Sequence, residues 1–216
     1  MQQDSESTRT SYNRVAEEYT RLIPDELKDK PLDRELLDRF AERVEGKGHV
    51  CDLGCGPGHI ARYLHERGAI VFGIDLSPMM VEQARRISPS IEFRQGDMRA
   101  LDLRDRELAG IAAFYSIIHI PREEVAEVLE ELRCVLQPDG LLLLAFHRGS
   151  NVVHMDEWWG ESVSLDFAFF EREEMEGYLR QASFTIEESI EREPYPEVEH
   201  QSHRVYIFAR NAQVAD

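Results

Sequence analysis

The stretch VCDLGCGPGH, residues 50–59, decides the fold. It begins as an apolar strand, turns through glycines between Gly54 and Gly58, and runs at once into a helical pattern over 60–67. A strand, a tight glycine turn and a helix together form the phosphate- or nucleoside-binding corner of an open α/β sheet. Glycine suits this corner because the chain must turn sharply and let a ligand approach where a Cβ would collide.

The spacing of these glycines separates the loop from two common nucleotide-binding loops. A dinucleotide loop reads G-x-G-x-x-G, and counting from Gly54 its third glycine would fall at His59. The triphosphate-binding pattern G-x-x-x-x-G-K-[ST] is absent from the sequence. The stretch reads D-x-G-x-G-x-G instead, which resembles the first motif of the class I S-adenosylmethionine (SAM) methyltransferases. The resemblance implies a cofactor cradle made of Asp52, Gly54, Cys55, Gly56 and Gly58.

A second family feature follows at the end of the next strand. Residues 69–75 form an apolar run that ends in Asp75, about 20 residues beyond the loop, where a ribose-binding acid lies in such folds. Ser77 and Pro78 are suited to the cap and first position of the next helix. The segment G-I-D-L-S-P-M-M resembles the second motif of the family, which implies that Asp75 binds the ribose while Leu76 and Met80 form an apolar wall for adenine.

The third strand, expected over 91–95, leads into Gly96, Asp97 and Met98. This triplet resembles the G-D-x segment of the family, in which the acid binds the adenine amino group and the next side chain packs on the ring. The fourth strand is expected over 108–116, and by the same resemblance Phe114 and Tyr115 lie beside the methionine moiety. Three strand-end features in this order are hard to obtain by chance.

Candidate catalytic residues follow strands four and five. His119 and His147 are expected at the carboxyl edge of the sheet, where ligands bind in open α/β folds. Histidine titrates in the range useful for proton transfer, so either would serve as a base if the acceptor needs one. Tyr115 is a candidate for orienting the acceptor, and structural roles remain open for all three. Glu199, His200 and His203 are weaker candidates for the mouth of the pocket.

The whole chain, residues 1–216, is interpreted as a single domain. Residues 1–10 are expected to fray, and residues 1–46 to form an N-terminal helical cap. Within it, the segment with Tyr12 and Tyr19 resembles the Y-x-x-x-A-x-x-Y helix that packs over the cofactor in bacterial small-molecule methyltransferases. Residues 147–170 are irregular and aromatic, and we expect a lid over the acceptor, with a hydrophobic patch or dimer contact as the alternative.

The expected fold class is α/β: a Rossmann-like, seven-stranded, mostly parallel sheet in the order 3-2-1-4-5-7-6. The resemblance implies that its last strand is antiparallel and that helices cover both faces. A helix is expected over 122–136, a turn over 137–140 before strand five, and a last strand pair over 184–190 and 202–210.

The composition limits the kinds of binding partner and the cellular location that we expect. The net charge of −17 opposes binding to a nucleic-acid backbone. Three cysteines and no suitably spaced histidines predict neither a disulfide framework nor a metal site. The polar start of the chain and the lack of a long apolar run predict a cytoplasmic protein without a membrane span. We expect a monomer or homodimer.

The predicted function is SAM-dependent methyl transfer to a small-molecule acceptor, which leaves S-adenosylhomocysteine (SAH). Whether oxygen, nitrogen or carbon is methylated stays open. The first alternative is a non-catalytic module that binds SAM or SAH, whose cofactor half would look the same. An NAD-type oxidoreductase or an aminopropyl transferase would share the fold, but the missing third glycine opposes the former and the lack of an acid-rich motif after strand four opposes the latter.

Overall fold

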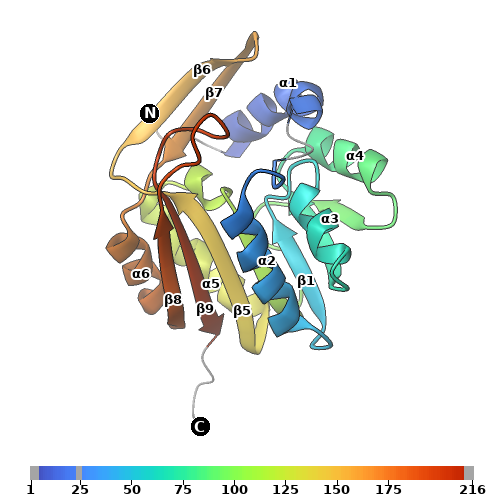
Figure 1. The fold of residues 1–216 in the computed structure, drawn as a ribbon, viewed down its shortest axis with the longest axis vertical. Helices are drawn as coiled ribbons and strands as arrows, with labels where there is room; N and C mark the ends of the chain where they lie inside the picture. The colour runs from blue at the N-terminus through green and yellow to red at the C-terminus, as the bar shows by residue number, and fades with distance from the viewer. Residues whose placement is uncertain (1–4, 23–25, 212–216) are drawn as a thin grey trace.

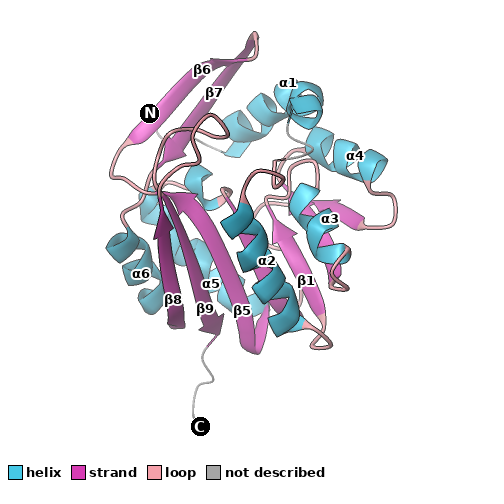
Figure 2. Ribbon diagram, in the orientation of Figure 1, coloured by secondary structure: helices cyan, strands magenta, loops and turns pink. Residues whose placement is uncertain are grey.

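The main sheet has seven strands in the order β3-β2-β1-β4-β5-β9-β8. Figure 2 labels β1, β5, β9 and β8 of this sheet. The computed structural model describes residues 5–22 and 26–211. Because β8 and β9 are the sixth and seventh strands of this sheet along the chain, the predicted order is confirmed, as is the antiparallel last strand. The strands are β1 (His49–Leu53), β2 (Ile70–Asp75), β3 (Glu92–Gln95), β4 (Leu108–Phe114), β5 (Leu136–His147), β8 (Phe184–Arg192) and β9 (Arg204–Asn211).

Helices cover both faces of the sheet, as predicted (Figure 1). Successive side chains of a strand point to opposite faces, so β1 sends Cys51 and Leu53 into one core and Val50 into the other. The Val50 side is covered by α2 (Pro31–Val44), α3 (His59–His65) and α4 (Pro78–Ile87). The Cys51 side is covered by α5 (Val125–Val135) and α6 (Arg172–Gln181). Burial on both faces explains why β4 is apolar throughout.

Parallel pairing brings the predicted loops to one edge. Leu53 pairs with Ile74, and Asp75 pairs with Gln95, so the segments that follow β1, β2 and β3 emerge side by side. The hydroxyl of Ser77 accepts a hydrogen bond from the Met80 amide at 3.1 Å and caps α4, as the sequence predicts. After β4 the chain forms two short 3-10 turns, η1 (Ile117–His119) and η2 (Arg122–Glu124).

The turn predicted over 137–140 lies within β5 rather than ahead of it. Leu108 pairs with Leu136 and Gly110 with Leu141, so these four residues bulge out of a strand whose pairing resumes beyond them. The backbone of Asp139 takes a positive φ of 63° at this point. The turn chemistry was therefore read correctly, but the pairing of Leu136 lengthens the strand.

Residues 147–170 are not irregular, so that prediction is wrong. They contain an antiparallel hairpin of β6 (Val152–Trp158) and β7 (Glu161–Ala168) that stands apart from the main sheet. Trp159 and Gly160 form its two-residue turn, both with positive φ, which matches the twist of paired strands. The signal was present in the alternation of Val163 and Leu165, both buried, but no residue of β6 is buried, so the partner strand shows no matching alternation.

The hairpin packs on α1 (Ser5–Leu22), and the two elements form a cap over the carboxyl edge of the sheet (Figure 1). The expected fraying of residues 1–10 is wrong from Ser5 onward; residues 1–4 lie outside the described part of the chain. The helix persists because the hydroxyls of Ser7 and Ser11 donate to the Ser164 carbonyl at 3.1 and 3.3 Å. The Ser164 amide donates back to Ser11 at 2.9 Å.

Candidate functional site

A cavity of about 940 Å³ lies between the carboxyl edge of the sheet and the cap. Segments from almost every part of the fold contribute to its wall, from α1 to the start of β9. The predicted site residues line it except for Asp52, Gly58 and the weaker candidate His203, and the other two weaker candidates, Glu199 and His200, also line it. Those that line it are Tyr12, Tyr19, Gly54, Cys55, Gly56, Asp75, Leu76, Met80, Gly96, Asp97, Met98, Phe114, Tyr115, His119 and His147.

Two glycines shape the loop after β1 for different reasons. Gly54 has a φ of 71°, and a Cβ at this position would lie only 2.2 Å from the Cβ of Ser116. Gly56 has a φ of 51°, but a Cβ there would meet nothing within 4 Å. The first glycine therefore allows two loops to touch, whereas the second keeps open a space beside the backbone that a ligand can fill.

Asp52 faces the helix behind the loop instead of the cavity. It is 1% exposed, and its carboxylate accepts the Ala61 amide at 2.8 Å, in the first turn of α3. That turn begins at Gly58, which has no side chain to cap it. Asp52 thus takes over the role of a cap, and burial raises the pKa of its carboxyl to about 7.

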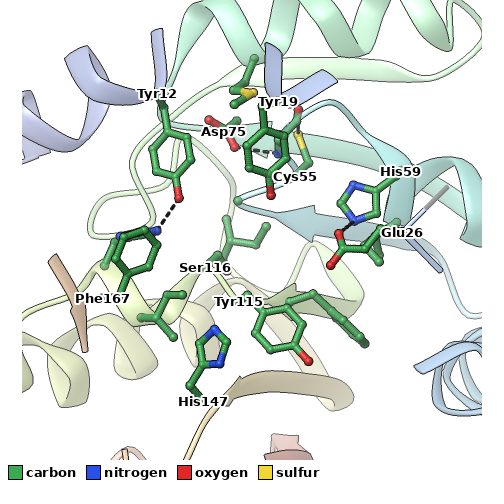
Figure 3. A pocket seen from close by; sticks show the side chains of 18 of the residues that line it. Tyr12, Tyr19, Glu26, Cys55, His59, Asp75, Tyr115, Ser116, His147 and Phe167 are labelled. Carbon is green, nitrogen blue, oxygen red and sulfur yellow. Dashed lines mark hydrogen bonds and ion pairs between the residues drawn. The ribbon is translucent and has the colours of Figure 1, made fainter. Parts of the chain in front are cut away.

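Asp75 grips the loop and faces the cavity. One carboxylate oxygen accepts the Gly56 amide and the other accepts the Ser77 amide, both at 2.8 Å (Figure 3). Burial raises the pKa of this carboxyl to about 6, although both hydrogen bonds favour the charged form. Each oxygen retains a lone pair for a donor on a ligand.

The adjoining slot is lined by Leu76, Met80, Asp97 and Met98. Met80 is 1% exposed and fixed by the start of α4. The Asp97 carboxylate accepts the amide of Arg99 at 3.0 Å. An apolar slot with one acid at its end suits a flat heterocycle that carries an amino group.

Tyr12 and His119 join the cap to the sheet edge. The Tyr12 hydroxyl lies 2.7 Å from His119 Nε2, and His119 Nδ1 lies 3.0 Å from the Asp166 carbonyl (Figure 3). A carbonyl only accepts, so Nδ1 carries the proton and Nε2 accepts from Tyr12. Burial lowers the pKa of His119 to about 4. The imidazole is therefore neutral, and its one lone pair is engaged.

His147 is held in a similar way on the opposite side of the cavity. Its Nδ1 lies 2.8 Å from the hydroxyl of Ser202, and Arg204 donates to that same hydroxyl. Because Arg204 can only donate, the serine hydroxyl accepts from it and turns its own proton toward His147. Burial, followed by the positive charge of Arg204, lowers the pKa of His147 to about 3. The ring stacks on Phe169 at 4.9 Å.

Tyr115 lies between these groups in an unusual backbone conformation. Its φ is 53°, although it is neither glycine nor asparagine, and its amide donates to the Ala145 carbonyl at 2.8 Å. Such conformations are uncommon and occur preferentially at functional sites. The conformation turns the ring into the cavity beside His147, across from Asp75 (Figure 3).

A buried ionic cluster in this wall was missed by sequence reasoning, apart from Glu199. Arg192 contacts the carboxylates of Asp33, at 2.9 Å, and Glu199, and Lys30 and Arg204 lie within 3.5 Å of Glu199. All five side chains are at most 8% exposed. Burial raises the pKa of Glu199, but the hydrogen bonds from Arg192 and the Tyr195 amide, together with the charges of Arg204 and Lys30, lower it to about 2. No motif marks these residues, because Lys30 and Asp33 come at least 159 positions before Arg192, Glu199 and Arg204 in the chain. Only the folded chain brings the two groups together.

Two properties concern the described residues alone. Over residues 5–22 and 26–211, no helix has the length and apolar character needed to cross a membrane. Within the same residues, no cluster of three or more histidine, cysteine or acidic side chains is arranged to hold a metal ion.

Comparison with known proteins finds a methyltransferase family model that matches part of the chain. Residues 50–140 match the family described as "Methyltransferase domain". The chain is 26% identical over 147 residues to a malonyl-[acyl-carrier protein] O-methyltransferase of Enterobacter lignolyticus, which covers 67% of this chain and 58% of that protein. It is 37% identical over 116 residues to the trans-aconitate 2-methyltransferase of Escherichia coli O157:H7, covering 50% of this chain and 42% of that protein. The chain thus spans about half the length of these relatives.

A solved structure has the same fold over nearly the whole chain. It is the 1,6-didemethyltoxoflavin-N1-methyltransferase of Burkholderia thailandensis with 1,6-didemethyltoxoflavin and S-adenosylhomocysteine bound. The TM-score is 0.74 at 20% identity, over 97% of this chain and 89% of that one. Residues 50–140 therefore match a methyltransferase domain, and the chain has the fold of the class I SAM-dependent methyltransferases.

Proposed function

We propose that this protein transfers the methyl group of SAM to a small-molecule acceptor. The observation that carries the proposal is one cavity with two unlike walls. On one side lie the open space at Gly56, the carboxylate of Asp75 and the slot at Met80. Across from Asp75 lie Tyr115, which the family resemblance also places beside the methionine moiety, and His147, which belongs to no cofactor motif (Figure 3).

The residues of the first wall fit SAM. The backbone around Gly54, Cys55 and Gly56 would hold the methionine end of SAM. A Cβ at Gly56 would enter open space, so the glycine leaves room there for a ligand to lie against the backbone. Asp75 would accept hydrogen bonds from the ribose hydroxyls with its remaining lone pairs. Leu76, Met80 and Met98 would enclose the adenine, and Asp97 would accept from its amino group.

The protein's own part in the reaction is positioning and exclusion of water. Bound SAM supplies an electrophilic methyl group on a sulfonium. The cap covers the cavity, and edge contacts among Tyr12, Tyr19 and Trp158 at 5.7 to 6.3 Å build its inner surface. Holding two reactants in line in a dry site removes much of the entropic barrier of a bimolecular transfer.

Of the candidate catalytic residues, we assign His119 a positioning role. Its lone pair is engaged by Tyr12, and its pKa of about 4 makes it a weak base at neutral pH. His147 has the same two properties, with a pKa of about 3. Tyr115 would contact the acceptor directly, since its ring is exposed to the cavity.

The names of the relatives bear on the acceptor. The relatives are named for acceptors as different as trans-aconitate and a carrier-bound malonyl group, so they support a small acyl or acid acceptor without choosing one. The net charge of −17 disfavours nucleic acid as a partner. We further propose a cytoplasmic monomer or homodimer that needs no metal.

The test is binding of SAH measured by calorimetry, with NAD as the competing ligand. We expect saturable SAH binding that Asp75→Asn weakens at least about thirtyfold, since a charged acceptor of two hydroxyls is lost. The matched control is Asp38→Asn, an acid on the outer side of α2 that lies outside the cavity wall. Binding of NAD in preference to SAH would refute the proposal. Tight SAH binding with no methyl transfer to any acceptor would favour the non-catalytic module.

A further inference from the structure

We infer that Ser202 and Arg204 fix the tautomer of His147, so that its Nε2–H is a hydrogen-bond donor to the acceptor molecule. The acceptor molecule then presents a lone pair, such as that of a carbonyl oxygen, to this wall of the cavity. The inference deepens the proposed function and rests on it only in taking the bound molecule to be the one that is methylated. Ser202 and Arg204 are positioning residues in this arrangement, because they act through His147.

The direction of the hydrogen bonds is set by Arg204. A guanidinium donates hydrogen bonds and never accepts them, and Arg204 donates to the hydroxyl of Ser202. The same hydroxyl lies 2.8 Å from His147 Nδ1. It makes no other hydrogen bond within the described part of the chain, so its own proton is directed at Nδ1. Nδ1 therefore accepts, and the proton of the neutral ring is on Nε2.

The charge of Arg204 favours the same neutral form. Burial, followed by this positive charge, lowers the pKa of His147 to about 3, so the ring carries one proton at neutral pH. A carboxylate bonded to Nδ1 would have the opposite effect, because it would hold the proton there and leave a lone pair on Nε2, as in a general base. With a serine and a cation at Nδ1, His147 is a donor instead of a base.

The Nε2 edge of the ring is free for a ligand. His147 lines the cavity, and its Nε2 makes no hydrogen bond to any residue that the structure describes. This nitrogen is not sealed in the protein interior, in contrast to Nδ1 of His59. Phe169 stacks on the imidazole at 4.9 Å, and Tyr115 is tilted against it at 5.2 Å between centroids. These aromatic neighbours hold the plane of the ring and leave the N–H to a ligand.

The charged groups of this wall provide no internal partner for the Nε2–H. Glu199 is bonded to Arg192 and accepts the amide of Tyr195 at 2.8 Å. His200 meets the His147 ring edge-on with centroids 5.8 Å apart, and no hydrogen bond joins these two rings. Both acids and a lysine line the same part of the cavity: Asp29, Glu197 and Lys30. The sign of the local charge therefore does not select an acceptor, whereas the direction of one N–H does.

The first test measures the tautomers directly by nitrogen NMR of the imidazole rings at pH 7, in the full chain without any ligand. We expect the proton on Nε2 in His147 and on Nδ1 in His119, whose Nδ1 donates to the Asp166 carbonyl at 3.0 Å. His119 is thus an internal reference for the opposite tautomer. A proton on Nδ1 of His147 would overturn the inference, whatever the protein binds.

Variants test the part played by the serine. Ser202→Ala removes one hydrogen bond to Nδ1, so we expect the ratio of the Nε2–H to the Nδ1–H tautomer of His147 to fall about fivefold, whereas Ser202→Thr keeps the hydroxyl and the ratio. Ser189→Ala is the matched control, since it removes a hydroxyl that donates to Glu176 at 2.8 Å outside the cavity wall. An unchanged ratio in Ser202→Ala, with the His119 signals intact as proof of folding, contradicts the inference.

Three probes of similar shape test the ligand. Acetophenone offers a carbonyl lone pair, ethylbenzene offers no polar atom, and α-methylbenzylamine offers an ammonium donor. In the SAH-loaded protein we expect acetophenone to bind at least about fivefold more tightly than the other two and to shift the Nε2–H signal of His147. Failure of acetophenone to bind, preference for either other probe, or binding without this shift would overturn the inference. Failure to bind SAH would instead refute the proposed function, and the tautomer measurement would be unaffected.

Discussion

The two walls of the cavity are built in opposite ways. The cofactor wall consists of three consecutive strand ends, and its decisive contacts use backbone amides, such as those of Gly56 and Ser77 on Asp75. The acceptor wall gathers side chains from α1, α2, η1 and β9, which are far apart in the chain. A backbone cradle holds one invariant ligand and tolerates little change, whereas a wall of separate side chains can be altered residue by residue to suit another acceptor.

The largest expected effect comes from Gly54→Ala, where the two walls meet. The added Cβ would lie 2.2 Å from Ser116 Cβ, so β1 and β4 could not keep their present separation. We expect the free energy of unfolding to fall by about 3 kcal/mol, and we expect SAH binding to be lost. Gly46→Ala is the control, because its φ of 68° imposes the same backbone strain with nothing within 4 Å.

Gly46→Ala is expected to lower the free energy of unfolding by only about 1 kcal/mol, as measured by thermal or chemical unfolding. Equal losses in the two variants would mean that backbone strain alone, rather than the contact with Ser116, makes Gly54 necessary.

The next largest effect is expected in the pH dependence of SAH binding, which reports on Asp75 in the cofactor wall. The pKa of Asp75 is raised to about 6, so its ionised fraction at pH 5 is about one tenth of that at pH 7.5. If ribose binding requires the ionised form, SAH affinity falls about tenfold over this interval as pH is lowered. Calorimetry at both pH values measures this change. The Asp52 carboxyl titrates in the same window with a pKa of about 7, so Asp52→Asn serves as the control and should retain the effect.

The stability of the unliganded protein should change in the opposite sense. Burial raises the pKa values of Asp52 and Asp75 above the unfolded value of 3.8, so the folded state binds protons more readily. The folded state is therefore destabilised as pH rises from about 4 to 7, by the sign of the linkage relation. Urea midpoints across this range in the wild type and in Asp52→Asn measure it. A midpoint that rises with pH equally in both proteins would contradict the assignment.

A smaller effect is expected at the link between cap and sheet. Tyr12→Phe keeps the ring against the cavity but removes the hydrogen bond to His119 Nε2. We expect kcat/KM for the acceptor to fall about fivefold, with SAH affinity changed less than twofold. Tyr63→Phe is the control. It removes a hydroxyl that donates to Asp38 at 3.0 Å, outside the cavity wall, and it should change neither quantity. A larger loss of SAH affinity than of kcat/KM would place Tyr12 in the cofactor wall.

The smallest effect is expected where α1 and β7 are hydrogen-bonded to each other within the cap. Ser11→Ala removes a buried hydroxyl that bonds both the amide and the carbonyl of Ser164. The expected cost is about 1 kcal/mol of stability, together with faster amide hydrogen exchange in β7 than in β1. Exchange that accelerates equally in both strands would show that the hairpin does not loosen separately from the sheet.

The sequence predicted the local fold of the segment around residues 50–98 closely, because the information that decides it is local. Strand, glycine turn and helix follow one another within 50–65, and the acids at 75 and 97 end their own strands. Parallel pairing then carries these ends to one edge, whatever the rest of the chain does. The exception is Asp52, whose place in the motif could not reveal that its carboxylate turns toward Ala61.

The sequence by itself therefore determined the order of the strands, and it predicted the edge at which we propose that a ligand binds and the class of that ligand. Only the tertiary structure decided that 152–168 form a hairpin on α1, that the lone pairs of His119 and His147 are engaged, and that Lys30 meets Arg204. The physical reason is range. Turn chemistry and strand pattern act between neighbours, whereas burial and ion pairing depend on which distant segments the packed core brings together.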